Sequence, residues 1–145
     1  MSAGFLLDTN VPSELTKPLP NVRVVGWVKD QDNASLHLSV VSVGELRRGF
    51  TILPLSKRRT QLEQWFEHYL LPLFADRILP VTHSIGNRWG VLCGECKLRG
   101  TPLNTADGMI AATALEHDLT IVTRNLKDFA GLGVTVFSPW DSVMI

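Results

Sequence analysis

The chain has 145 residues, of which 45% are hydrophobic and 19% charged, a composition typical of one folded domain with its own core. Its 14 Lys and Arg residues balance its 14 Asp and Glu residues, so the formal net charge is zero. Proteins that coat nucleic acid through general charge are usually basic, so we expect any contact with nucleic acid to be local. The opening residues form no basic leader, and no apolar stretch approaches the roughly 18 residues of a membrane span. We therefore expect a cytoplasmic protein with no membrane association and a single domain over residues 1–145.

The first predicted strand sets the pattern for the rest of the chain. Residues 5–7 form a short apolar run that ends at Asp8, and Asn10 and Pro12 follow. Such a run, bounded by polar and turn residues, is typical of a strand buried on both faces of a parallel sheet. Open α/β sheets bind ligands at the carboxyl ends of their strands, so Asp8 is a candidate binding residue. The alternative interpretation is that Asp8 only starts a turn or caps a helix.

Predicted strands and helices then alternate along the chain. We expect a short helix opened by Pro12, and strands over residues 36–41, 77–81, 119–123 and 134–137. We also expect a helix that begins after Ser42, and helices over residues 21–31, 56–71, 84–98 and 105–117. Alternation of this kind predicts an α/β fold, in which a central parallel β-sheet is flanked by helices and the crossovers are right-handed.

Glu45 has a structural and a functional interpretation. Ser42 can cap the helix that follows the second strand, and Glu45 lies three residues later, which is the spacing of a capping box. In the functional interpretation, Glu45 lies one turn into a helix that follows a strand. That position places its carboxylate over the same sheet edge as Asp8.

More polar residues occur at corresponding places further along the chain. Asp107 lies in the first turn of a helix of small and apolar residues, predicted to be capped by Thr105, where the helix dipole also favours an acid. Thr123, Asn125 and Asp128 follow the strand at residues 119–123. If the sheet is parallel, these side chains share one edge with Asp8 and Glu45.

Carboxylates that converge in this way repel one another unless they are protonated or neutralised by a metal ion. Hard oxygen ligands without His or Cys suit Mg²⁺ or Mn²⁺. One or two such ions can orient a water molecule, lower its pKa and stabilise charge on a phosphate. The pattern therefore favours hydrolysis of a phosphodiester bond.

Three other features have more ordinary interpretations. Cys93 and Cys96 have C-x-x-C spacing, but there is no second ligand pair to complete a zinc site, so they are expected to be ordinary thiols of a helix. His37 lies in a predicted strand without a nucleophile beside it and is interpreted as structural. The basic run at residues 57–59 is either a solvated helix face or a local patch that contacts phosphate.

The chain resembles the PIN-domain ribonucleases of the VapC toxin type, in the FitB-like branch, over essentially its whole length. The resemblance rests on the order and spacing of four motifs, which are Leu-Asp-Thr-Asn at 7–10, Ser-Val-Gly-Glu-Leu at 42–46, Thr-Ala-Asp-Gly-Met-Ile-Ala-Ala at 105–112, and Thr-Arg-Asn at 123–125 running into Lys-Asp-Phe at 127–129. It implies a PIN-like three-layer sandwich for the whole chain.

The resemblance also implies an activity and its partners. It implies a Mg²⁺- or Mn²⁺-dependent endoribonuclease toxin that cleaves RNA, forms a homodimer and is silenced by a cognate antitoxin, which feeds an extended segment into the acidic groove. Asp8, Glu45 and Asp107 match the three principal acids of the family and are the expected catalytic residues and metal ligands. The matching polar positions expected to support them are Asn10, Ser42, Thr123, Asn125 and Asp128. Asn125 stands where the family often has a fourth Asp, and it brings no charge.

Three alternatives compete with this nuclease hypothesis. A haloacid-dehalogenase-like phosphatase needs a second Asp two residues after Asp8, where this chain has Asn10. A receiver domain needs a Lys near its last strands and leaves Glu45 without a role. The third alternative is a catalytically weak PIN-like module whose acidic groove only engages a protein partner, with Asn125 marking the lost activity.

Overall fold

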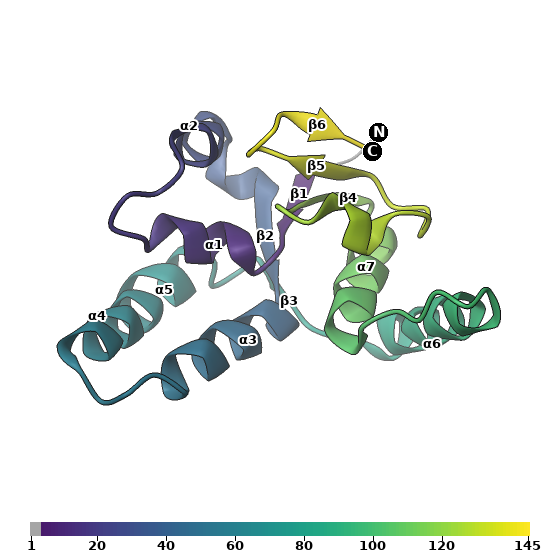
Figure 1. The fold of residues 1–145 in the computed structure, drawn as a ribbon, viewed down its shortest axis with the longest axis horizontal. Helices are drawn as coiled ribbons and strands as arrows, with labels where there is room; N and C mark the ends of the chain where they lie inside the picture. The colour runs from purple at the N-terminus through teal and green to yellow at the C-terminus, as the bar shows by residue number, and fades with distance from the viewer. Residues whose placement is uncertain (1–3) are drawn as a thin grey trace.

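The computed structural model describes residues 4–145 as a central sheet with helices on both sides (Figure 1). The sheet has six strands in the order β3-β2-β1-β4-β5-β6. Five of these strands pair in parallel, and β6 is antiparallel to β5. The strands are β1 (Gly4–Leu7), β2 (Leu36–Ser39), β3 (Ile78–Leu79), β4 (Leu119–Val122), β5 (Val136–Ser138) and β6 (Val143–Met144).

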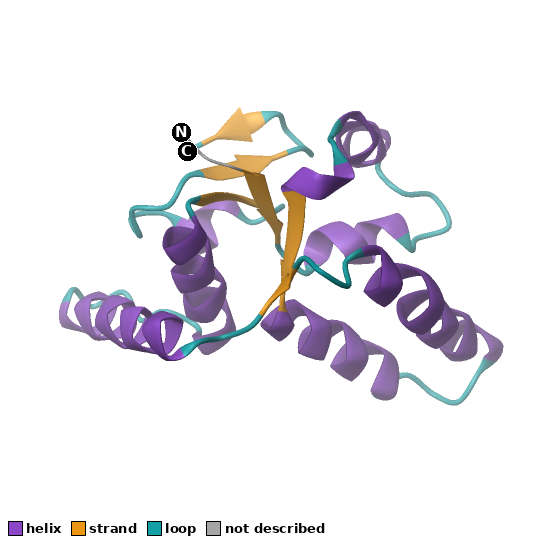
Figure 2. Ribbon diagram, turned by 180° about the vertical axis from the view of Figure 1, so that it is seen from behind, coloured by secondary structure: helices purple, strands orange, loops and turns teal. Residues whose placement is uncertain are grey.

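The helices form the two outer layers of the predicted sandwich (Figure 2). One layer contains α1 (Asn10–Leu15), α2 (Val22–Asp30), α3 (Val40–Thr51), α4 (Lys57–Trp65), the π-helical segment η2 (Phe66–Leu70) and α5 (Leu71–Leu73). The other layer contains α6 (His83–Leu98) and α7 (Thr105–His117). Short 3-10 segments occur at η1 (Asn33–Ser35) and η3 (Leu126–Phe129). The three-layer α/β architecture is therefore confirmed. No helix within residues 4–145 has both the length and the apolar character needed to cross a membrane.

The first strand shows why the apolar run 5–7 is continuous. Successive side chains of a strand point to opposite faces, so a strand covered on both faces needs apolar residues at consecutive positions. Leu7 packs into the core below the α1–α5 layer, together with Phe50 and Phe66. Leu6 packs into the core below α7, together with Ile110. The first strand thus links the two cores.

The strand order brings the ends of β1 and β4 together. From β1 the chain proceeds outward through β2 and β3, and it then returns to the opposite side of β1 at β4. Leu7 pairs with Val122, so Asp8 and Thr123 leave the sheet side by side. The point where the strand order reverses is where open α/β sheets form a ligand crevice, at the carboxyl ends of the strands.

Two predicted helix caps are wrong. The strand predicted over residues 36–41 ends at Ser39, whose side chain accepts a hydrogen bond from Val41 N at 3.0 Å and caps α3. Ser42 is therefore inside the helix, and the capping box of Ser42 and Glu45 does not form. The error arises because apolar residues at positions 40 and 41 fit the end of a buried strand and the first turn of a helix equally well. Asn104 caps α7 in place of Thr105, because its side chain accepts from the N–H groups of residues 106 and 107.

Other element boundaries also differ from the predictions. The long helix expected over residues 56–71 is present, but its middle is the π-helical segment η2. The last predicted strand, at 134–137, lies at Val136–Ser138, and the strand predicted at 77–81 is only Ile78–Leu79. The sequence did not predict β6, since two residues are too few to show a periodicity.

Helices α6 and α7 pack closely at Gly108. A Cβ atom at this position would lie 2.8 Å from Trp89 Cδ1 and 3.2 Å from Cys93 Sγ. Both cysteines are free thiols, and Cys96 is buried, as expected of ordinary helix residues. Because Gly108 follows Asp107 directly, this contact also sets how close the start of α7 lies to α6.

We expect Gly108→Ala to lower the free energy of unfolding by about 1–3 kcal/mol, because the added methyl group overpacks the contact with Trp89. The control is Gly94→Ala on α6, where a Cβ would meet no atom within 4 Å. That variant should gain up to about 1 kcal/mol, since Ala favours a helix over Gly. Urea unfolding of the two variants checks this, and equal changes in free energy would contradict the proposed contact.

Candidate active site

An open pocket of about 300 Å³ lies where β1 and β4 end. Carboxylates from four parts of the chain line it, namely Asp8 after β1, Glu45 of α3, Asp107 of α7 and Asp128 of η3. The structure thus brings together the three predicted principal acids and the predicted supporting acid. We call this the acid pocket. Its remaining lining residues are Thr9, Asn10, Ser13 and Asn125.

Asp8 is the most constrained of the four acids. Only 7% of its surface is exposed. Its Oδ2 accepts a hydrogen bond from Thr123 Oγ1 at 2.8 Å, and its Oδ1 accepts one from Thr9 N at 2.8 Å. Asn10 Nδ2 also lies 3.4 Å from Oδ2. These donors hold the buried carboxylate in one orientation.

Thr123 and Asn10 tie the two strand ends together. Thr123 Oγ1 accepts from Asn10 Nδ2 at 3.1 Å and from Asn125 N at 3.0 Å. Asn10 Oδ1 accepts from Arg124 N at 3.3 Å. Hydrogen bonds therefore join the loop that follows β4 to the start of α1. Because the Thr123 hydroxyl accepts from both of these donors, its proton is free to point at Asp8. Asn125 is exposed, and it lines the acid pocket from this loop.

Glu45 is held through a residue that the sequence analysis missed. Thr9 Oγ1 donates to Glu45 Oε1 at 2.6 Å and lies 2.9 Å from Ser42 Oγ. Because a hydroxyl carries one proton, the buried Ser42 hydroxyl is the donor in the second contact when Thr9 donates to the carboxylate. The position of Thr9 between Asp8 and Asn10 was the sign in the sequence that it belongs to the site. Its role could not be predicted, because its partner Glu45 lies 36 residues away along the chain.

Burial and the neighbouring acids raise the pKa of Asp8 and Asp107. Burial raises the pKa of Asp8, against the lowering effect of the Thr123 hydrogen bond, and the charges of Glu45 and Asp128 raise it further. Burial also raises the pKa of Asp107, and with the charges of the other three acids it brings that pKa to about 6. None of the four acids forms an ion pair with any residue in 4–145. The acid pocket therefore carries negative charge that its surroundings do not balance.

The donor set fits a hydrated divalent cation. No group of three or more His, Cys, Asp or Glu side chains within residues 4–145 is arranged to hold one metal ion directly. Mg²⁺, however, keeps several of its waters and is usually held by one or two protein carboxylates. The acid pocket offers four carboxylates and the amide of Asn125, all with hard oxygen atoms. Its uncompensated charge is a second feature that a cation would satisfy.

The fold and the site together define a three-layer α/β protein with an acidic pocket at the switch point of its parallel sheet. The PIN domain family model matches residues 5–133. The chain therefore belongs to the PIN-domain family, which confirms the predicted resemblance and the PIN-like fold.

Similar proteins include bacterial toxins and ribonucleases. The chain is 42% identical over 136 residues to toxin FitB of Neisseria gonorrhoeae, covering 94% of this chain and 98% of that protein. It is 38% identical over 137 residues to the VapC ribonuclease Y4jK of Sinorhizobium fredii, covering 94% and 98% of the two chains. A crystal structure of FitAcB from Neisseria gonorrhoeae matches with a TM-score of 0.89 and 41% identity, over 94% of this chain and 98% of that chain.

The raised pKa of Asp107 predicts how stability depends on pH when a chelator removes metal ions. The folded protein holds this proton up to about pH 6, whereas the ordinary pKa of the carboxyl is 3.8. Between about pH 4 and pH 6 the folded state therefore binds more protons than the unfolded state does. The stability of the folded state falls as the pH rises through this range. We expect Asp107→Asn to raise the melting temperature near neutral pH and to change it much less near pH 4, where the folded carboxyl is protonated and the unfolded one is only partly ionised.

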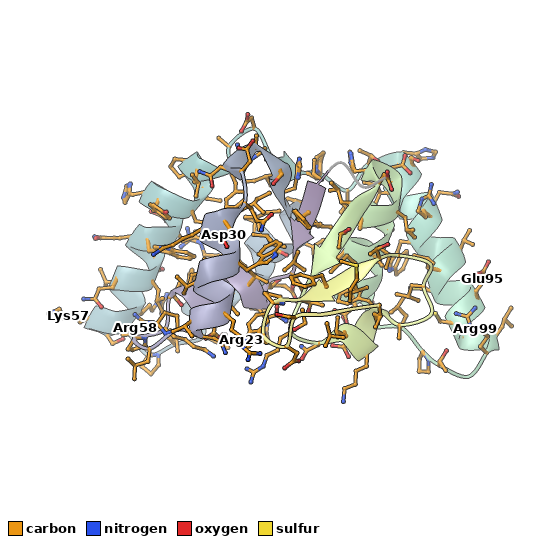
Figure 3. The ribbon with its side chains drawn as sticks, turned by 90° about the horizontal axis from the view of Figure 1, so that it is seen from above. Arg23, Asp30, Lys57, Arg58, Glu95 and Arg99 are labelled. Atoms are coloured by element: carbon orange, nitrogen blue, oxygen red, sulfur yellow. The ribbon has the colours of Figure 1, made fainter. Side chains whose placement is uncertain are left out.

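The control for this prediction is Asp30→Asn, which removes an exposed acid of α2 outside the acid pocket (Figure 3). Melting curves at the two pH values compare each variant with the original protein. A stabilisation by Asp107→Asn that is the same at both pH values would show that carboxylate ionisation is not its cause.

Proposed function

We propose that this chain is a metal-dependent endoribonuclease toxin that hydrolyses RNA phosphodiester bonds and is neutralised by a cognate antitoxin. The observation that carries the proposal is the convergence of Asp8, Glu45, Asp107 and Asp128 on one pocket, where none of them forms an ion pair with a residue in 4–145. The similarity to proteins named toxin FitB and VapC ribonuclease supports the same function.

The proposed cofactor is Mg²⁺, for which Mn²⁺ can substitute, and its proposed ligands are Asp8, Glu45 and Asp107, one or two of them binding directly and the rest through the waters that the ion keeps. When bound, such an ion supplies a water of lowered pKa and neutralises charge on the phosphate that is cleaved. The hydrogen bonds that Thr9 N and Thr123 Oγ1 donate to Asp8 hold its carboxylate in place without a metal ion. Asp8, the most buried of the proposed ligands, therefore does not need to move when the ion binds. Asn125 offers an oxygen ligand without adding to the repulsion.

The proposed roles of the other residues follow from their contacts. Thr123 and Asn10 position Asp8, and Ser42 and Thr9 position Glu45. Thr9 donates to Oε1 of Glu45, whereas no hydrogen bond within residues 4–145 reaches Oε2. Oε2 is therefore the atom that can accept a proton from an attacking water.

The proposed partners are an RNA substrate, an antitoxin and a second copy of this chain, and the proposed location is the cytoplasm. A similar solved chain, with a TM-score of 0.88 and 40% identity, belongs to FitAB bound to an IR36 DNA fragment. We propose that the antitoxin silences this chain by covering the acid pocket, because that pocket is open to solvent and rich in unpaired charge. Residues 1–145 are taken as one PIN domain.

The test is cleavage of a mixed cellular RNA pool by the purified protein with Mn²⁺ or with chelator. We expect discrete products with metal, and a loss of rate of more than about a hundredfold in Asp8→Asn, since even residues that only orient metal ligands cost about 10–100-fold when removed. The variant should remain folded, because the amide keeps the shape of the buried side chain.

Undiminished cleavage by Asp8→Asn would contradict the assignment of the acid pocket. A lack of products with either metal would favour the alternative function, in which the acidic groove only engages a protein partner. The Asn125→Asp variant then tests whether the missing fourth carboxylate is the reason, because restored cleavage would identify that residue as the cause.

A further inference from the structure

A second pocket adjoins the acid pocket. It has a volume of about 280 Å³ and lies between the end of α6, the loop before α7 and the segment η3. The two pockets share Asp107 and Asp128. We call the second one the side pocket, and its other polar lining residues are Arg99, Thr101, Asn104 and Lys127.

The side pocket contains the two cations that border the acids. Arg99 and Lys127 are both exposed, and neither forms an ion pair with any carboxylate in residues 4–145. The Arg99 guanidinium makes a weak contact from Nη2 to Cys96 Sγ at 3.4 Å. Arg47 and Arg88, by contrast, are paired with glutamates on other helices. Arg99 and Lys127 are thus available to an anion from outside the chain.

The neighbouring polar groups suit such an anion. Asn104 uses its Oδ1 to accept from the N–H groups of Ala106 and Asp107, so its Nδ2 group is left to donate. Arg99 can offer two parallel N–H groups to phosphate oxygens, and Lys127 can add a point charge. The side pocket therefore combines charge with directional donors.

We propose that Arg99 and Lys127 bind a backbone phosphate of the RNA strand next to the phosphate that is cleaved. The proposal rests on the proposed function of the acid pocket. An RNA strand at the acid pocket continues past it, and on the Asp107 and Asp128 side its next phosphate would meet uncompensated acids. The side pocket places two cations on that side, where phosphate contacts supply affinity and fix the position of the strand.

An acidic peptide is a weaker candidate for the side pocket. Its carboxylates would contact Arg99 and Lys127, but they would leave the acid pocket beside them unbalanced. A phosphate strand engages both pockets, because the divalent cation that neutralises the acids also binds phosphate oxygens. The continuity of the two pockets through Asp107 and Asp128 therefore favours RNA.

The basic run at residues 57–59 does not serve this purpose. Figure 3 shows Lys57 and Arg58 at the opposite end of the molecule from Arg99. Arg58 Nη2 donates to Thr16 O at 2.7 Å, and Arg59 pairs with Glu63 and donates to Leu53 O. None of its residues lines the acid pocket or the side pocket, so the run supplies no phosphate contact at either place. A phosphate contact elsewhere on this helix face stays a prediction.

The test compares two double variants that each remove two positive charges. The first, Arg99→Gln with Lys127→Gln, removes both cations of the side pocket. The second, Lys57→Gln with Lys97→Gln, is the control, because both of its residues are exposed and line neither pocket. For RNA cleavage we expect the first variant to raise KM about tenfold and to leave kcat nearly unchanged, because the lost contact binds a phosphate that does not react. The control should match the original protein in both parameters.

A binding measurement separates this proposal from the catalytic one. The same double substitutions are placed in Asp8→Asn, and affinity for a short fluorescent single-stranded RNA is measured by anisotropy at several salt concentrations. We expect Arg99→Gln with Lys127→Gln to weaken binding about tenfold and to reduce the slope of log K against log salt by about 0.7, the value for one phosphate of a single strand. The control should change neither quantity.

Three outcomes would decide against the proposal or its basis. Equal KM and equal salt dependence in the two double variants would overturn the phosphate site while leaving the nuclease assignment intact. If RNA binding is unchanged but binding of the purified antitoxin is lost, the side pocket serves a protein partner and the proposal is wrong. If the original protein cleaves no RNA, the proposed function fails, and equal RNA binding by the two double variants would then overturn the phosphate site as well.

Discussion

Repulsion among carboxylates at one edge of a parallel sheet is the constraint on which the rest of the site depends. The pairing of Leu7 with Val122 fixes Asp8 beside Thr123, and helices from both outer layers add Glu45 and Asp107. Burial makes the charge on Asp8 costly, and the hydrogen bonds from Thr123 and from the Thr9 backbone offset only part of that cost, since its pKa remains raised. A fold selected for stability alone would place a cation there. None of the four acids is paired with a cation within residues 4–145, which supports the proposal that a cation binds there from outside.

Although the net charge is zero, the charges are not evenly paired, because four acids gather at one pocket without ion pairs. Several basic residues are committed to structural contacts, such as Arg47 with glutamates of α4 and η2, and Arg77 with the backbone carbonyls of Leu36 in β2 and Leu73 in α5. Arg99 and Lys127 stand apart from these, because they border the acids without pairing with them. A local arrangement of this kind is what an almost neutral protein needs in order to hold a polyanion at one place and not over its whole surface.

The sequence predicted the site better than it predicted the local structure around it. Asp8, Glu45, Asp107 and Asp128 follow or flank strands, and parallel strands bring such positions to one edge whatever the exact boundaries are. The caps Ser39 and Asn104 depend on the backbone angles of single residues, which an apolar pattern does not encode. The role of Thr9 depends on a contact with a residue 36 positions away, and β6 is too short to have a pattern. These features come from tertiary packing, so only the structure revealed them.

We propose above all that the acid pocket is a cation site, in which a divalent ion relieves the repulsion among the carboxylates. The most direct measurement is a thermal unfolding titration of the purified protein with Mg²⁺ and Mn²⁺, beside Asp8→Asn and beside NaCl of equal ionic strength. We predict that both metals raise the melting temperature of the original protein, by an amount that corresponds to about 2.7 kcal/mol at a hundredfold excess over Kd, and that Asp8→Asn shows a much smaller rise. No shift at millimolar metal, or an equal shift in Asp8→Asn, would contradict the claim.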